Sequence, residues 1–223
     1  MTNQDTHLHS KFSYDGENSI EEMVKTAIKL GLKEIAFTEH VEKNTKWVDK
    51  FVKEIKRVQR KYPQVKIYSG IEAKVIDLNG NIDATNKVFK KVDLVLGSFH
   101  RIPKAKEKYL VHEEILSDKK RALHLWYRAM IELQKNKNVD IIAHPTAMLK
   151  KYEIRLPNSM KKAIVKNAKK YKKVFEFNKK YKVPDKEFLS MLRKKKVKIT
   201  YGSDSHNIKN FLKSYKKKHN KLS

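Results

Sequence analysis

Short apolar segments rich in Val, Ile and Phe alternate along the whole chain with amphipathic segments of helical period. Short apolar runs predict strands, whereas apolar residues spaced three and four apart predict helices that face a core. We predict seven strands, in the segment before His7 and at residues 34–38, 65–69, 93–97, 140–143, 174–177 and 198–201. We predict helices at residues 20–30, 47–61, 84–91, 118–135, 158–171 and 185–195, and from residue 207 onward. This alternation favours a parallel sheet, either closed as a barrel or open and doubly wound.

The first helix carries explicit signals at both ends. Ser19 and Glu22 form a Ser-x-x-Glu capping box, in which each side chain can accept a hydrogen bond from the other residue's backbone N–H. Gly31 follows the last apolar position and can end the helix. The helix boundaries are therefore predicted more sharply here than elsewhere.

Nearly every predicted strand ends in a side chain that can bind a metal ion or a polar ligand. In strand order these residues are His7 and His9, His40, Glu72, His100, His144, Asn178, and Asp204 with His206. The carboxyl ends of the strands converge on one face of a β/α barrel, so residues distant in sequence meet there. We therefore predict an α/β fold, a single-domain distorted barrel of seven β/α units that resembles a TIM barrel.

The residue types at these positions favour metal binding. One such histidine alone is more simply explained as a hydrogen-bonded structural residue, but six of the nine histidines lie at strand ends. His7 and His9 point to the same face of an extended segment and can grip one ion, and Asp204 and His206 repeat that spacing. The chain has no cysteine, so any metal must be held by imidazole and carboxylate ligands, which favours divalent zinc, manganese or iron.

The remaining histidines lie away from the strand ends. We predict that His112, His124 and His219 are surface residues.

The length of 223 residues suits one domain, which we place at residues 1–210, followed by a basic C-terminal tail at 211–223. We expect Lys213 to Lys221 to be frayed and solvated. No apolar run is long enough for a membrane span, and the first residues lack the pattern of a signal peptide, so we expect a cytoplasmic protein with no membrane partner. The sequence does not indicate an oligomeric state.

The formal net charge is +27, with 52 Lys and Arg against 25 Asp and Glu. A surface this basic attracts polyanions such as nucleic acid or phosphorylated metabolites. Lys greatly outnumbers Arg and is spread over nearly every predicted helix, which an A/T-rich genome would also produce. Both explanations stay open at this point.

Seven motifs taken together resemble the polymerase and histidinol phosphatase (PHP) family, and they occur in order over almost the whole chain. They are His7-Leu8-His9, Asp15-Gly16, Thr38-Glu39-His40, Gly70-Ile71-Glu72, Ser98-Phe99-His100, Ala143-His144-Pro145 and Gly202-Ser203-Asp204-Ser205-His206. The resemblance implies a distorted seven-stranded barrel with a trinuclear metal site, in agreement with the seven predicted strands.

The resemblance also implies how the ligands are shared among three ions. His7, His9, Glu72 and Asp204 would hold the first ion, and Glu72 would bridge to a second ion held by His100 and His144. Asp15, His40 and His206 would hold the third. One departure from the family pattern is Glu39, where an Asp before the His is more usual; its longer reach could shift His40.

The chemistry expected at such a site is hydrolysis of a phosphate ester by a metal-activated hydroxide, with the ions clamping the phosphate oxygens. We predict catalytic roles for Glu72, Asp204 and His206, of which Asp204 or His206 could protonate the leaving group. Arg101 and Lys179 are candidates for contacts with the substrate phosphate, although an ordinary surface charge is the favoured explanation for each.

Three functions remain to be compared. The first is a phosphatase acting on a phosphorylated small molecule such as histidinol phosphate, as members of the family do. The second is a nuclease or phosphodiesterase acting on DNA, RNA or nucleotide ends, because Asn79-Gly80-Asn81-Ile82-Asp83 and Ala-His-Pro-Thr resemble PHP domains attached to bacterial family X DNA polymerases. The third, a non-catalytic binding module, is disfavoured because lost catalysis would leave no physical need for the full set of ligands.

Overall fold

The computed structural model describes residues 3–215. Seven parallel strands form one sheet in which each strand pairs with the next main strand along the chain. These are β1 (Gln4–Leu8), β2 (Glu34–Val41), β3 (Lys66–Lys74), β4 (Leu94–Ser98), β7 (Ile141–Ala143), β8 (Val174–Asn178) and β9 (Ile199–Gly202). All seven predicted strands are present, each within a few residues of its predicted position.

The sheet curls until its first and last strands nearly meet. Leu8 at the end of β1 bridges to Ser205 just beyond β9, and the N–H of Asp204 donates to the carbonyl oxygen of His7 at 2.9 Å. The buried carboxylate of Asp5 accepts from the N–H of His7 at 3.1 Å and from that of Ser203 at 3.0 Å. The barrel alternative is therefore correct, and the seam of the barrel joins two segments that carry predicted metal ligands.

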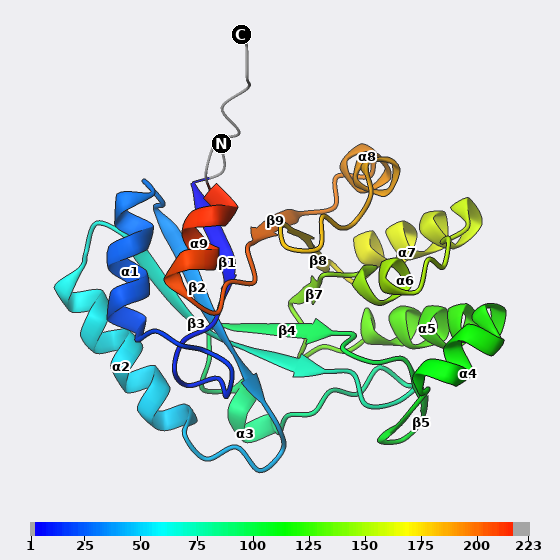
Figure 1. Cartoon of the computed structure of the whole chain (residues 1–223), viewed down its shortest axis with the longest axis horizontal. Helices are drawn as coiled ribbons and strands as arrows, with labels where there is room; N and C mark the ends of the chain where they lie inside the picture. The colour runs from blue at the N-terminus through cyan, green and yellow to red at the C-terminus, as the bar shows by residue number, and fades with distance from the viewer. Residues whose placement is uncertain (1–2, 216–223) are drawn as a thin grey trace, which may run out of the picture.

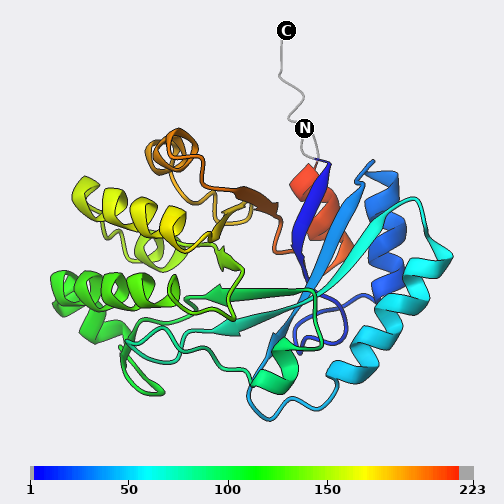
Figure 2. The same ribbon diagram turned by 180° about the vertical axis from the view of Figure 1, so that it is seen from behind.

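Helices occupy nearly every connection between the strands. They are α1 (Ile20–Lys29), α2 (Val48–Lys61), α3 (Asn86–Phe89), α4 (His112–Ser117), α5 (Lys119–Leu133), α6 (Ala147–Lys151), α7 (Asn158–Lys170), α8 (Lys186–Lys194) and α9 (Ile208–Tyr215). Helices α1, α2 and α9 lie beside β1 to β3, whereas α5, α7 and α8 lie together on the other side of the molecule (Figures 1 and 2). None of the helices within residues 3–215 is long and apolar enough to cross a lipid bilayer.

The capping signals of the first helix are confirmed. Ser19 Oγ accepts from the N–H of Glu22 at 3.3 Å, and the Glu22 carboxylate accepts from the N–H of Ser19 at 2.8 Å. Met23, Val24 and Ala27 of this helix are fully buried against the sheet. The helix thus begins and faces the core as its sequence predicts.

Four short elements were not predicted, and all follow β4 or β7. After β4 the chain forms a small antiparallel hairpin, β5 (Pro103–Ala105) with β6 (Lys108–Tyr109), and then helix α4. Helix α6 follows β7 directly, and the predicted helix at 84–91 shrinks to the four residues of α3. These elements are too short to display a period, so they had no signal to detect.

The C-terminal helix belongs to the packed domain. Phe211 of α9 is fully buried in the cluster that contains Leu8 and Phe37, and the hydroxyl of Tyr215 donates to the Asp5 carboxylate at 3.0 Å. The domain boundary predicted at residue 211 falls inside this helix, so the described part of the domain extends to Tyr215. The rest of the predicted tail, with His219, lies outside the described residues.

Candidate metal centre

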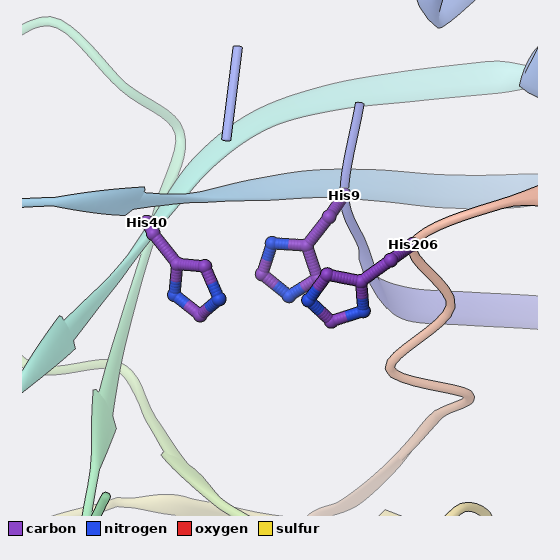
Figure 3. Close-up of side chains that lie close together, drawn as sticks. All are labelled: His9, His40 and His206. Atoms are coloured by element: carbon purple, nitrogen blue, oxygen red, sulfur yellow. The ribbon is translucent and has the colours of Figure 1, made fainter. Parts of the chain in front are cut away.

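The polar strand ends meet at one mouth of the barrel. His9, His40 and His206 come from the ends of β1, β2 and β9, and their imidazoles point toward one another (Figure 3). The ring centroids of His9 and His206 lie 4.1 Å apart, and those of His9 and His40 lie 4.4 Å apart. Residues separated by up to 197 positions thus lie close enough to bind one ligand, as convergence of the strand ends predicts.

Glu72, at the centre of this mouth, is almost fully buried and faces five imidazoles. Its Oε2 lies 3.3 Å from His7 Nε2, 3.6 Å from His9 Nε2 and 3.1 Å from His40 Nδ1. Its Oε1 lies 3.0 Å from His100 Nε2 and 2.8 Å from His144 Nε2. The two oxygens of one carboxylate therefore face two different groups of histidines.

A second acidic group lies at the outer edge of the cluster. Asp15 Oδ2 is 3.2 Å from His206 Nε2 and 3.6 Å from His40 Nε2. The tight turn that presents Asp15 requires a glycine next to it, because a Cβ on Gly16 would lie 1.9 Å from the carbonyl oxygen of Ser10. The Asp-Gly pair therefore does more than form a generic turn: it places a carboxylate beside two histidines.

The ninth predicted ligand, Asp204, lies between these groups, with Oδ1 3.8 Å from His9 Nε2 and 3.5 Å from His206 Nδ1. Asp204 and His144 both have positive φ angles, of 53° and 27°. Non-glycine residues rarely adopt this backbone conformation.

Glu176 is a functional residue that the strand-end argument missed. It is fully buried on β8, its Oε1 lies 2.7 Å from His7 Nδ1, and its Oε2 accepts from the N–H of His144 at 2.5 Å. A carboxylate on Nδ1 fixes the tautomer that leaves Nε2 of His7 free to act as a ligand. Glu176 lies two residues before Asn178 on the same face of the strand, so the alternation of β8 could have indicated it.

Glu39, the departure from the family pattern, has a defined role. Its carboxylate accepts from the hydroxyl of Ser10 at 2.6 Å and from that of Ser13 at 2.5 Å. Ser13 Oγ in turn lies 3.1 Å from His9 Nδ1 and accepts from the N–H of His40 at 3.0 Å. The longer side chain therefore reaches two histidines through Ser13 and positions both.

The ionisable side chains of the cluster shift one another's pKa values. Burial lowers the pKa of His9 well below its usual value, and the adjacent His7 and His40 add to this effect. Burial raises the pKa of Glu39 to about 7, against the hydrogen bonds from Ser10 and Ser13. Burial tends to raise the pKa of Glu72, but the nearby His100 and His7 outweigh this effect and hold that pKa well below its usual range. The Glu72 carboxylate thus lies among imidazoles, a set of donor groups that suits a divalent cation.

A cavity of about 420 Å³ opens onto the cluster and has basic and aromatic side chains at its rim. Arg101 lines this cavity, but Lys179 does not: its ammonium lies 3.2 Å from the centroid of the Tyr215 ring. The next residue, Lys180, lines the cavity instead, with Nζ 3.3 Å from Asp204 Oδ1.

The other polar residues named from the sequence lie away from the centre. Asn178 Oδ1 accepts from the N–H of Tyr181 at 3.1 Å, so it holds the turn after β8. His112 and His124 are exposed, on α4 and α5 respectively, as predicted for surface residues.

A family model described as PHP domain matches residues 5–181. The chain belongs to the PHP domain family. A relative named "Probable phosphatase", from Caldicellulosiruptor saccharolyticus, is 31% identical over 210 residues, which cover 91% of this chain and 79% of that protein. The PHP domain is also 27% identical over 217 residues to the DNA polymerase/3′-5′ exonuclease PolX of Bacillus subtilis, covering 92% of this chain and 34% of PolX.

Among solved structures, the PHP domain is similar to a histidinol phosphate phosphatase of Lactococcus lactis, crystallised with zinc, L-histidinol and phosphate. The TM-score is 0.72 at 22% identity, over 95% of this chain and 89% of that one. The predicted family and fold are confirmed. The predicted enzyme class is confirmed as well: the PHP domain is a phosphoesterase.

Proposed function

We propose that the PHP domain binds two or three divalent metal ions and hydrolyses a small phosphomonoester such as histidinol phosphate. The observation that carries this proposal is Glu72, whose two carboxylate oxygens each face a separate set of imidazole nitrogens within 3.6 Å. A carboxylate in this position suits a bridge between two cations. The similarity to a histidinol phosphate phosphatase that binds zinc, L-histidinol and phosphate supports the substrate class.

The donor set fits divalent cations of borderline softness. Three groups of three donors each have their ligand atoms within 4.8 Å of one another: His7, His9 and Asp204; His40, Glu72 and His100; and His9, His40 and His206. His9 and His40 each belong to two of these groups. Nδ1 of His40 faces Glu72, and its Nε2 faces Asp15. We propose the nine ligands His7, His9, Asp15, His40, Glu72, His100, His144, Asp204 and His206, with zinc, manganese or iron as the metal.

Divalent ions bound at such a site polarise phosphate oxygens and lower the pKa of bound water. Side chains around the cavity would orient the substrate and supply a proton. Arg101 and Lys180 flank the cavity, where their cationic groups can orient a phosphate that enters it. His206 lines the same cavity with its Nδ1 3.1 Å from the carbonyl oxygen of Asp204, and we propose it, with Asp204, as the proton donor to the leaving oxygen.

The test is release of phosphate from histidinol phosphate by the manganese-reconstituted protein and by its Glu72→Gln variant. The variant should lose about 100-fold or more in kcat/KM and at least one equivalent of metal, because an amide cannot bridge two cations. Glu34→Gln is the matched control, since Glu34 is exposed at the opposite end of the strands. A Glu72→Gln protein that keeps its full metal content and activity would refute the assignment.

The similarity to PolX makes a nuclease or phosphodiesterase the second candidate, and the net charge of +27 is compatible with it. The same protein should then cleave oligonucleotides, with a rate that falls steeply as salt increases, because contacts with several phosphates release counterions. Hydrolysis of histidinol phosphate without cleavage of oligonucleotides would reject this candidate.

A further inference from the structure

A second cavity, of about 610 Å³, adjoins the metal centre. The β5–β6 hairpin, α4 and α6 form its walls, and His100, Arg101 and Tyr109 line both cavities. A molecule bound at the metal centre can therefore extend past Arg101 and Tyr109 into a space larger than the metal-side cavity. A simple phosphate ester would leave this space unused.

The second cavity is basic, and its cations are available. Arg101, Lys108 and Lys151 line it, and none of them has a carboxylate partner within 4.0 Å among residues 3–215. The one carboxylate in its lining, Glu107, is paired at 2.5 Å with Lys43. A group that enters the cavity thus meets three uncompensated positive charges.

Tyr109 lies at the junction of the two cavities and offers a free donor. Its hydroxyl is shielded from solvent and has no hydrogen-bond partner within the described chain. A buried polar atom without a partner is costly and calls for a ligand group. A phenol can donate to an anionic oxygen, and its ring is flanked by Arg101 at 5.8 Å.

We infer that this second cavity is a subsite for a second anionic group of the substrate, a phosphate or carboxylate remote from the ester that is cleaved. The inference deepens the proposed function and rests on it, since the first phosphate must occupy the metal centre. Lys108 and Lys151 would neutralise the second anionic group. The Tyr109 hydroxyl would donate a hydrogen bond to the part of the substrate that links its two anionic groups. The preferred substrate then carries two anionic groups.

Binding of phosphonates, which the enzyme cannot hydrolyse, tests the subsite directly. Alkane bisphosphonates of increasing chain length are compared with monophosphonates of the same length by calorimetry on the metal-reconstituted protein. At the optimal length the second phosphonate should tighten binding about tenfold or more, and Lys151→Ala and Tyr109→Phe should each remove most of that gain. Lys166→Ala is the control, because Lys166 is also exposed and unpaired but lies on α7.

The outcomes separate the two proposals. Hydrolysis of p-nitrophenyl phosphate, which has a single anionic group, tests the metal-dependent phosphatase without the subsite. Equal affinity for bisphosphonates and monophosphonates at every length, in a protein that hydrolyses p-nitrophenyl phosphate, would overturn the subsite alone. Faster hydrolysis of thymidine 3′,5′-bisphosphate than of thymidine 5′-monophosphate would indicate that the substrate is a small metabolite with two anionic groups. Faster hydrolysis of a 5′-phosphorylated dinucleotide would indicate that the second anion belongs to the end of a nucleic acid.

Discussion

Substitution of Gly202 by Ala tests how the barrel seam positions the metal ligands. Gly202 ends β9 opposite the carboxylate that orients His7. A Cβ at this position would lie 1.9 Å from Glu176 Oε1 and 2.6 Å from His7 Cβ, whereas real Cβ contacts are essentially never shorter than 3.0 Å. Glu176 Oε1 would have to move away by more than 1 Å. The contact with His7 is at Cβ, next to the backbone, so His7 could not relieve it by a change of side-chain rotamer.

The expected magnitude follows from this overlap. The 2.7 Å contact between Glu176 and His7 Nδ1 would lengthen beyond hydrogen-bond distance if Oε1 withdrew away from the ring. Loss of a carboxylate that orients a metal-binding histidine typically weakens metal affinity about 10- to 100-fold. The extra methyl group in a fully packed interior should also lower the free energy of unfolding by about 1–3 kcal/mol.

Chelator competition measures the metal affinity of the Gly202→Ala protein, and urea denaturation measures its stability. Gly31→Ala is the matched control: Gly31 has φ +74° with no neighbouring atom within 4 Å, so a Cβ there strains the backbone without touching the site. It should cost about 1–2 kcal/mol of stability and leave metal affinity unchanged. If Gly202→Ala binds metal as tightly as Gly31→Ala does, the orienting role of Glu176 is wrong.

Two further predictions concern stability. Lys61 and Arg57 hold the pKa of Glu21 down to about 2, from its usual 4.5. This ion-pair cluster therefore stabilises the fold above pH 4.5, and the stabilisation is lost as the pH falls toward 2. Glu21→Gln should lower Tm at pH 7, and an equal loss of Tm at pH 2 would contradict the assignment. Phe211→Ala should cost about 3–5 kcal/mol in urea denaturation because Phe211 is fully buried, whereas Leu212→Ala, at a 37% exposed neighbour, should cost about 0.5 kcal/mol. Similar losses for the two variants would mean that α9 is not part of the core.

The sequence predicted the frame of the fold because its long elements carry periodic signals. The hydrophobic pattern alone predicts the seven strands and the capped first helix, and the convergence of strand ends predicts that His9, His40 and Glu72 lie together. That inference depends only on strand direction and order, which a β/α alternation specifies. Functional residues at or next to the carboxyl end of a strand are therefore the easiest to predict.

Residues that act from within a strand or just after one were harder to predict. Glu176 lies inside β8 between two phenylalanines, and a buried carboxylate there has no function until His7 is placed across the barrel from it. Lys179 and Lys180 are chemically identical, and only the turn after β8 decides that Lys180 faces the cavity while Lys179 lies against Tyr215. Turn geometry of this kind is not encoded in a periodic pattern.

The residues proposed for metal binding and those proposed for substrate selection lie on different kinds of element. The proposed metal ligands lie on or next to the barrel strands, where packing holds them, with Glu72 fully enclosed at the centre. The residues proposed to select the substrate, Tyr109 and Lys151, belong to the short hairpin and the short helix that the sequence did not predict. Loops and short elements tolerate change because few buried contacts depend on them. Related PHP domains can therefore keep one metal centre while they act on different phosphate esters, and the elements after β4 and β7 are where such differences should be sought.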